Sequence, residues 1–511
     1  MDGVRRFKFR RTTLLICGLA AFLAGIALAR TKIYIPIEWF WASIIPFMVT
    51  FKQKRWLALA SIVLCGLALG WWRGSIFMTR LANYDELYKR PVIITAKADS
   101  DGIYSTNSQL AFDVTHVEVT DPLQTELVGK ISVKGFGANA VYRGDMVQVE
   151  SKLYPTRGSR QASISFAQIK VLSRSGSPIE SARRRFQTGM FSALPEPLAS
   201  FGLGMLIGQR NTLPKAANDQ MRAVGLSHIV AVSGYNLTII MTGLALFLRK
   251  RSKYQGTVLS LVLIILFLLF AGLSASIVRA AIVSVLGLWA TYYGRRFRPV
   301  LLILLAAALT AGWYPIYIWA DIGWYLSFFA FFGVLVIGPL IIKRLYGAKQ
   351  PKLLTAVLIE TASAQLMAFP LIMYIFGQVS IVALLANILI VPLVPVAMLL
   401  VFVAALGGMI MPALAGWLAW PARILLTYML DIISLLSRVP HALAQQGLPL
   451  PKMLGVYAII LGIVFILWSK TKGKNDMIEE LETDITLPQP IGHAAKAGSW
   501  VDKQIDIAGT K

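Results

Sequence analysis

The strongest constraint on this chain is a succession of long apolar segments, such as the run VLSLVLIILFLLF at residues 258–270. A helix needs about 20 predominantly apolar residues to cross a bilayer. Hydrophobic residues make up 56% of the 511 positions, whereas soluble chains have about 45–50%. The pattern predicts a polytopic α-helical membrane protein. We expect membrane segments near residues 13–29, 37–51, 56–78, 190–208, 228–248, 256–273, 276–293, 299–314, 316–342, 353–377, 380–406, 422–438 and 452–468.

Clusters of lysine and arginine predict the orientation of these segments. Loops that stay in the cytoplasm collect basic residues, and such clusters occur at 52–55, 249–253, 295–298 and 343–352. The positions of these loops between the apolar segments are consistent with all of them facing the cytoplasm. We expect both termini on the cytoplasmic side as well. The segment 190–208 contains two prolines, and for it we also consider a position flat on the membrane surface.

Residues 84–175 have a different pattern, because short apolar runs there alternate with polar residues and turn signals. This predicts a small all-β domain outside the cytoplasm, and five strands suit either an OB-fold barrel or a sandwich. Cys17 and Cys65 lie in apolar runs and are interpreted as small core residues. The candidate strands are Val92–Ala98, Gln109–Val119, Leu127–Phe136, Asp145–Leu153 and Ser163–Leu172.

The net charge is +25. Basic inner loops account for much of it, and a polyanionic partner is the second explanation. Residues 225–300 contain no Asp or Glu at all, which topology explains less easily. The basic stretch 181–186 (SARRRF) is interpreted as a juxtamembrane anchor, with a pore entry as the alternative.

Polar side chains inside apolar segments are costly, so each such cluster is a functional hypothesis. Four regions qualify as pore or gate candidates, and each has a structural alternative. In chain order they are Gly225–Leu237, Ser274–Ala281, Asp321–Phe332 and Thr361–Pro395. The alternatives are an interhelical hydrogen-bond cluster, an Arg279 that pairs with Asp321 or reaches the interface, an Asp321 that caps a helix, and plain kinked packing. The candidates are Ser227, His228, Ser233, Gly234, Asn236, Arg279, Asp321, Ser327, Gln365 and Asn387.

Several kinds of chemistry lack their motifs. The four histidines are His116, His228, His441 and His493, and they form no zinc-binding pattern. The sequence has no GxxxxGK[ST] loop and no GxSxG elbow. We therefore expect no catalytic residues, no metal, no cofactor and no enzymatic activity.

The four regions, in this order, resemble the ComEC-type competence protein family. The matches across about 190 residues are Gly208–Arg210, Leu213, Gly225–Gly234 (GLSHIVAVSG), Ser276, Arg279, Ala280, Asp321, Leu326, Ser327, Phe328, Ala330, Gly333, Ala364, Gln365, Pro370, Phe376, Gly377, Ser380, Asn387 and Pro392. The run RGDMVQV at 143–149 resembles a late strand of the family's outside domain, which favours the OB-fold.

The sequence departs from the family pattern at three places. Asn236 stands where the family usually has His, and Tyr325 stands where it has Gln. Asn forms hydrogen bonds but does not titrate near neutral pH, so a proton-handling role at this position is in doubt. Many members continue into a metallo-β-lactamase-like domain, whereas this sequence ends about 40 residues after the last apolar segment.

The resemblance implies an inner-membrane channel for uptake of single-stranded DNA during natural transformation. It implies residues 1–80 as about three membrane segments, 81–178 as the outside OB-like domain, 179–470 as the channel core and 471–511 as a disordered cytoplasmic tail. The implied partners are single-stranded DNA, lipid, a DNA receptor, a separate nuclease and a cytoplasmic helicase. The alternatives are a transporter or flippase of another anionic substrate and a scaffold for a nuclease. The DNA-binding candidates are Arg157, Arg160, Arg183, Arg184 and Arg185.

Overall fold

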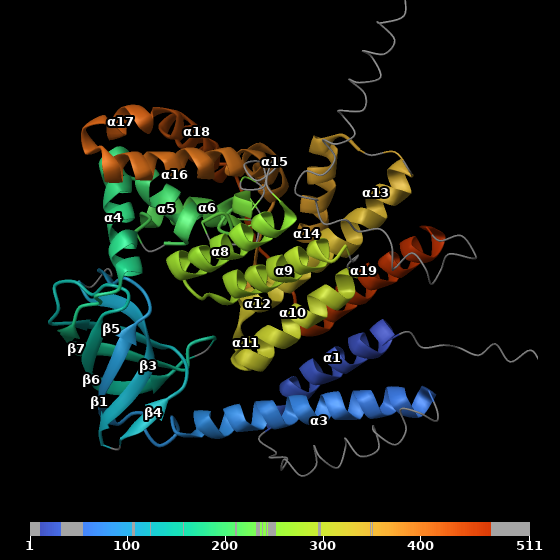
Figure 1. The fold of residues 1–511 in the computed structure, drawn as a ribbon, viewed down its shortest axis with the longest axis horizontal. Coiled ribbons are helices and arrows are strands. Elements are labelled where there is room, and N and C mark those ends of the chain that lie inside the picture. The colour runs from blue at the N-terminus through green and yellow to red at the C-terminus, as the bar shows by residue number, and fades with distance from the viewer. Residues whose placement is uncertain are drawn as a thin grey trace, which may run out of the picture.

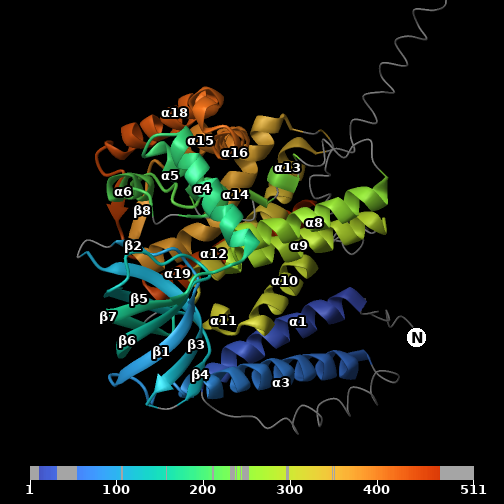
Figure 2. The same cartoon turned by 60° about the vertical axis from the view of Figure 1, so that its left-hand side comes forward.

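The structure of the protein is a computed structural model. It describes residues 11–31, 55–104, 108–122, 124–156, 158–209, 212–230, 236–237, 239–241, 243, 252–294, 298–347, 349 and 351–471. Figures 1 and 2 show a β-barrel beside a large helical core, with helix α3 leading into the barrel.

The N-terminal unit contains α1 (Arg11–Leu28), the short helix η1 (Ala29–Thr31) and α3 (Arg55–Ala82). Helices α1 and α3 lie side by side because glycines let their backbones touch (Figure 1). A Cβ atom at Gly25 would collide with the carbonyl oxygen of Leu67, and one at Gly70 would collide with that of Phe22. The glycine spacing therefore fixes this helix pair.

The β domain is a closed barrel of five long strands. β1 pairs antiparallel with both β3 and β6, β3 with β5, and β6 with β7, while β5 and β7 close the barrel as a parallel pair. Numbered along the chain, the five long strands follow the order 1–2–3–5–4–1, which is the OB-fold arrangement. The strands are β1 (Pro91–Ala98), β2 (Ile103–Tyr104), β3 (Leu110–Asp121), β4 (Thr125–Leu127), β5 (Ile131–Phe136), β6 (Met146–Pro155) and β7 (Ala162–Ser173).

The barrel has its own hydrophobic core, because alternate side chains on each strand point inward. Ile131 and Val133 of β5 and Val147 and Val149 of β6 are completely buried. Four of the five candidate strands are confirmed to within two residues, and the OB-fold replaces the sandwich alternative. The remaining candidate, Leu127–Phe136, joins the last residue of β4 to β5, which begins only at Ile131.

The helical core follows the barrel. Its first half contains α4 (Pro178–Ala193), α5 (Leu198–Ile207), α6 (Lys215–Ala223), α8 (Lys253–Ala271), α9 (Ala275–Tyr292), α10 (Pro299–Trp313), α11 (Ile316–Ala320), α12 (Ile322–Phe332), the π-helix η2 (Gly333–Ile337) and α13 (Gly338–Tyr346). Its second half contains α14 (Leu353–Phe376), β8 (Gln378–Ser380), α15 (Ala383–Ile390), η3 (Val391–Leu393), α16 (Val394–Ile410), η4 (Pro412–Leu414), α17 (Ala415–Leu418), α18 (Trp420–Ser437), β9 (Leu443–Gln445) and α19 (Leu450–Thr471).

Eight helices of the described chain are long and apolar enough to cross a membrane, which confirms a polytopic helical membrane protein with a β domain. Three shorter apolar helices accompany them, at Leu198–Ile207, Ser276–Ala290 and Pro299–Trp313. The eight are Thr12–Thr31, Ala58–Ala82, Lys253–Ala271, Ile322–Tyr346, Thr355–Phe376, Ala383–Ile410, Trp420–Ser437 and Leu450–Lys470.

One sequence expectation is wrong in the second half of the segment 190–208. Every residue of α5 is buried, so this helix is enclosed by protein and does not lie on a membrane surface. Helix α5 packs in the largest hydrophobic cluster, against α16 and α18. The structure also divides the expected segment 316–342 between α11, α12, η2 and the start of α13.

Candidate functional site

The first polar region packs against the fourth. Gly225 has a left-handed backbone (φ 74°), and a Cβ atom there would lie 2.8 Å from Cβ of Ala383 and 3.3 Å from Cβ of Ser380. Only glycine fits such a close approach without strain. Ser227 is half-buried, and the exposed His228 places Nδ1 3.2 Å from the carbonyl oxygen of Gly225. The candidates Ser233 and Gly234 lie outside the described residues.

Asn236 connects this region to the centre of the core. Its side chain is 3% exposed, and its amide Nδ2 donates to the carbonyl oxygen of Met205 over 2.7 Å. Met205 belongs to the buried helix α5. A buried amide held by a backbone carbonyl is a stable interhelical link, so the structure gives Asn236 a positioning contact.

Arg279 lies inside α9 with only 4% of its surface exposed. Its Nη2 donates to Oγ of Ser276 over 3.1 Å, and its guanidinium lies over the ring of Phe328 at 4.9 Å. Its Nη1 is buried and has no hydrogen-bond partner within the described part of the chain. The cation–π contact stabilises the charge, while Nη1 keeps a donor free for a polar ligand or water.

Asp321 caps helix α12, because its Oδ1 accepts a hydrogen bond from the backbone nitrogen of Trp324 over 3.0 Å. No ion pair between Asp321 and Arg279 occurs among the residues that the structure describes. Ser327 is half-buried one position before Phe328. The capping interpretation of Asp321 therefore agrees with the structure.

The fourth region links α14 to α15. Nδ2 of Asn387 lies 3.5 Å from Oε1 of Gln365, and Asn387 is 6% exposed. Oδ1 of Asn387 and Oγ of Ser380 are buried without a hydrogen-bond partner among the described residues. Gly333 begins the π-helix η2, and a Cβ atom there would collide with the carbonyl oxygen of Ser363 on α14. Such π turns are frequent at functional sites.

These contacts bring all four regions together. Regions two and three meet at Arg279 and Phe328, regions three and four at Gly333 and Ser363, and regions four and one at Ser380 and Gly225. We call this set the polar seam, and its members are Gly225, Arg279, Gln365, Ser380 and Asn387. Three of the buried polar atoms without a partner in the described structure belong to it.

The five candidate arginines lie in different environments. Arg157 lies outside the described residues, and Arg185 is exposed. Arg160 is half-exposed and forms an ion pair with Asp113 over 2.9 Å. Arg184 is half-buried and lies over the ring of Tyr142 at 5.7 Å. The exposed Arg185 and the half-exposed Arg160 are thus the most accessible of the described four.

Arg183 is engaged inside the protein. It is 6% exposed and lies 3.5 Å from Oδ2 of Asp101 and 3.6 Å from Oε2 of Glu180. Glu180 in turn lies 3.5 Å from Nε of Arg143. Burial lowers the pKa of Arg183, while Asp101 opposes this by favouring the charged form. Since Asp101 belongs to the barrel, this network fixes the barrel to α4.

Sequence reasoning missed a group of exposed residues on the barrel. Lys134 and Phe136 point outward from β5, and Phe136 is 47% exposed. Tyr104 of β2 is 60% exposed, and its hydroxyl donates to the carbonyl oxygen of Asn139 over 2.8 Å. Lys134 and Phe136 lie on the outer face of the β3–β5 pair, and strands at this position bind ligand in OB-folds. The register pairs Tyr104 with the inward-pointing Leu110, so Tyr104 lies at the edge of the barrel and not on that face. The OB-fold resemblance together with the strand alternation is the signal that identifies such residues in the sequence.

A second group joins the segment before β6 to the residues that follow β7. Tyr142 is 40% exposed, and the guanidinium of Arg174 lies over its ring at 5.2 Å, across from Arg184. Nη1 of Arg174 also pairs with the buried Asp145 over 2.6 Å. Among the described residues no group of three or more His, Cys, Asp or Glu side chains could hold a metal ion.

Fold and site together define a polytopic membrane protein that combines an OB-fold barrel with a helical core containing a polar seam. Residues 205–472, just over half of the chain, match the family described as Competence protein. The chain belongs to this family, and the matched region contains the whole polar seam. Membership supports a role in competence.

Among curated proteins, ComE operon protein 3 of Bacillus subtilis (strain 168) is 25% identical over 203 residues. The aligned part covers 39% of this chain and 25% of the relative. The chain thus matches about a quarter of the length of this curated relative. No solved structure matches the chain.

Proposed function

We propose that the protein is an inner-membrane channel through which single-stranded DNA enters the cytoplasm during natural transformation. The observation that carries the proposal is the match of residues 205–472 to the Competence protein family, because this region contains the four polar regions that pack together as the seam. The similarity to a ComE operon protein supports the same process.

The chemistry of the seam suits a passing phosphate backbone. Arg279 offers a buried guanidinium with one unpartnered nitrogen in the described structure, and residues 225–300 contain no acid that would repel phosphate. Asn387 and Ser380 offer polar atoms that are likewise unpartnered within the described chain. A low-dielectric surrounding strengthens each such contact.

The barrel would receive the strand. OB-folds bind single strands by stacking bases on exposed aromatic rings beside basic side chains. Phe136 and Lys134 provide an exposed ring beside a basic side chain on β5. A DNA receptor, a separate nuclease and a cytoplasmic helicase complete the proposed pathway as partners.

The barrel would lie outside the cytoplasm. Nη1 of Arg143 lies 3.5 Å from the carbonyl oxygen of Phe270 at the end of α8, and Tyr314, after α10, donates its hydroxyl to Oε1 of Gln161 over 3.3 Å. At their other ends, away from the barrel, α8 begins at Lys253 and α10 is preceded by Arg298. Since basic ends prefer the cytoplasm, the barrel belongs to the other side.

The test uses a naturally competent host that lacks this gene and is complemented with wild type, Arg279→Ala or Asn387→Ala. Membrane levels of each variant are measured in parallel. We expect deletion to abolish entry of labelled DNA into a nuclease-protected state, while DNA still binds the cell surface. Both point variants should lower entry at normal protein levels. Undiminished entry in the deletion strain would refute the channel, and a small-anion transporter would replace it.

A scaffold that only docks a nuclease gives a different result. In that case the deletion strain would lose strand degradation, but the polar-seam variants would behave as wild type. Loss of entry in Arg279→Ala with unchanged degradation of the second strand supports a role in passage itself.

A further inference from the structure

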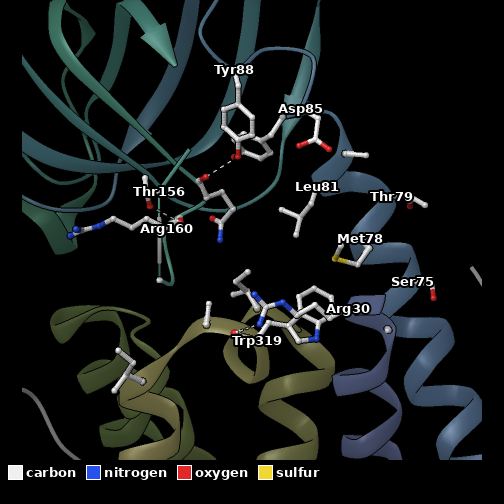
Figure 3. Close-up of a pocket in the computed structure, with 18 residues that line it drawn as sticks. Arg30, Ser75, Met78, Thr79, Leu81, Asp85, Tyr88, Thr156, Arg160 and Trp319 are labelled. Carbon is white, nitrogen blue, oxygen red and sulfur yellow. Dashed lines mark hydrogen bonds between the residues drawn. The ribbon is translucent and has the colours of Figure 1, made fainter. Parts of the chain in front are cut away.

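A cavity of about 810 Å³ lies between the barrel and the helical core (Figure 3). This volume falls within the range of about 300–1,000 Å³ that is usual for ligand pockets. Its upper wall is the barrel segment between β6 and β7, and its lower wall is formed by η1 and α11. Helix α3 closes one side, with Met78 pointing into the space (Figure 3).

The barrel wall of the cavity is the segment that joins the fourth and fifth barrel strands. In OB-folds this loop is one of two that contact oligonucleotide or oligosaccharide ligands. Thr156 and Gln161 belong to it and line the cavity, whereas the guanidinium of Arg160 turns away toward Asp113. The cavity therefore borders one of the two loops that contact ligands in OB-folds.

Three aromatic side chains line the cavity, and two of them, on opposite walls, have their rings held in place. Trp319 donates from Nε1 to the carbonyl oxygen of Ile26 over 2.9 Å and packs against Phe77 at 5.9 Å. Tyr88 donates its hydroxyl to the carbonyl oxygen of Gln161 over 3.1 Å. Rings that are already fixed lose little entropy when a flat ligand stacks on them.

The charged groups of the cavity are of both signs. Arg30 is exposed, and its Nη1 lies 3.4 Å from the carbonyl oxygen of Trp319. No ion pair of Arg30 occurs among the described residues. Asp85 lies on the other side of the space (Figure 3). A guanidinium binds phosphate, and a carboxylate accepts from the amino groups of bases.

The lower wall of the cavity reaches the start of helix α12, which contacts the polar seam further along. Ala320 and Ile322 line the cavity and flank Asp321, the cap of α12. Two turns further along α12, Phe328 carries the guanidinium of Arg279. The cavity thus connects the ligand loop of the barrel with the helix that contacts the seam.

We propose that this cavity is a transfer site that holds one or two nucleotides of single-stranded DNA between the barrel and the polar seam. Arg30 binds a phosphate, and Trp319 and Tyr88 stack on bases. The proposal rests on the proposed function, because the strand must reach the cavity from the barrel. The ligand of the cavity is the same strand, which it would hold between the barrel face and the polar seam.

Photochemical cross-linking tests the site in the full chain, reconstituted in nanodiscs of phosphatidylethanolamine and phosphatidylglycerol. The probe is a 20-nucleotide strand containing 5-iodo-deoxyuridine, and mass spectrometry identifies the cross-linked peptides. We expect cross-links at Trp319 or Tyr88 in addition to any on the barrel face. Barrel cross-links without a cavity cross-link would overturn the transfer site and leave the channel proposal intact.

Variants then test whether the cavity is used during uptake in cells. Met78→Trp fills the space, whereas Met78→Leu conserves its volume and serves as the control. Arg30→Gln removes the phosphate contact, and Arg80→Gln removes an exposed charge on α3 that does not line the cavity. We expect Trp319→Leu to lower DNA entry roughly 5- to 100-fold, the loss typical of one base-stacking contact. Met78→Trp and Arg30→Gln should also lower entry, because they fill the space and remove the phosphate contact.

The two controls should retain wild-type entry. Wild-type entry in Met78→Trp at normal protein level would overturn the transfer site, whereas full entry in the deletion strain would overturn the channel itself.

Native mass spectrometry tests whether the cavity binds a lipid headgroup instead of the strand. A phospholipid retained by wild type, lost in Arg30→Gln and not displaced by the strand would assign the cavity to a lipid headgroup instead.

Discussion

Arg279 is a residue whose burial costs free energy and whose side chain is also a candidate for ligand binding. A charge within an apolar helix is expensive unless it has partners, and here Phe328 and Ser276 supply only part of what a guanidinium needs. The remaining buried nitrogen has no partner within the described residues. A group kept in this state is suited to bind a polar ligand for short periods.

Substitutions at Arg279 should separate charge from geometry. Arg279→Met should lower DNA entry at least 10-fold, because it removes the charge and every donor. Arg279→Lys should lie between Met and wild type, since an ammonium keeps the charge but loses the planar stacking and the donor fork. Entry of labelled DNA and membrane protein level are the measurements. Equal entry in wild type and Arg279→Met would contradict the assignment.

Gly225 is constrained by both its backbone and its neighbours. Gly225→Ala should destabilise the protein by at least about 1–2 kcal/mol, which is the cost of a left-handed backbone for a residue with Cβ. The contact of the new methyl group with Ala383 adds to this cost. Thermal unfolding in detergent measures the effect. Gly256→Ala is the matched control, because nothing lies within 4 Å of its Cβ position; an equal melting temperature in both variants would be the contrary result.

At the scale of elements, the barrel is defined by how it closes. Its parallel pair β5–β7 brings Gly135 opposite Ala167, with an irregular register beside it. The barrel then joins the core through α4, whose buried network includes Asp101, Glu180 and Arg183. Closure and attachment are thus separate properties that different residues control.

Gly135→Val should open the barrel. A Cβ atom at Gly135 would collide with the carbonyl oxygen of Ala167, so the parallel pair has no room for a side chain. Limited proteolysis of the full chain should show faster cleavage within the barrel. Gly176→Val, where nothing lies within 4 Å of the Cβ position, serves as the control. Unchanged cleavage in Gly135→Val would contradict the prediction, because it would show that the β5–β7 pair accommodates a side chain at this position.

Arg183→Met should weaken the attachment of the barrel. Removing one partner from a buried ion-pair network leaves unpaired charge and costs about 3 kcal/mol, here at Asp101 and Glu180. A lower melting temperature in detergent is expected, with partial recovery when Asp101→Leu is added. Arg185→Met, at an exposed position two residues along α4, should melt as wild type does. Equal melting of both single variants would speak against the network.

At the scale of the whole molecule, the barrel and the basic helix ends lie at opposite ends of the same helices. The ends of α8 and α10 contact the barrel through Arg143 and Tyr314. Lys343 and Arg344 lie in the last turn of α13, whose span begins at Ile322 beside the barrel. In these three spans the end away from the barrel is therefore the basic one.

Cysteine labelling tests this orientation. In a Cys17→Ser, Cys65→Ser background, Lys134→Cys on the exposed barrel face should react with a membrane-impermeant maleimide in intact spheroplasts. Lys349→Cys, between α13 and α14, should react only after permeabilisation. Both positions are exposed in the structure, so accessibility within the protein is matched. The reverse labelling pattern would invert the proposed topology.

The sequence by itself determined the class of the protein, the strands of the barrel and the order of the polar regions. Long apolar runs and strict alternation depend only on which residues must leave water, and this is a local property. The family resemblance also placed Arg279, Gln365 and Asn387 among the candidates, and the structure brings their regions into contact.

Only the tertiary structure decided the rest. It enclosed α5 completely, although its two preceding prolines had suggested a surface position, because α16 and α18 cover it. It buried Arg183 while leaving Arg185 exposed, which a basic run in the sequence does not distinguish. It also formed a cavity from Arg30, Tyr88 and Trp319. Such contacts join residues far apart in the chain, and their formation depends on how whole elements pack rather than on local pattern.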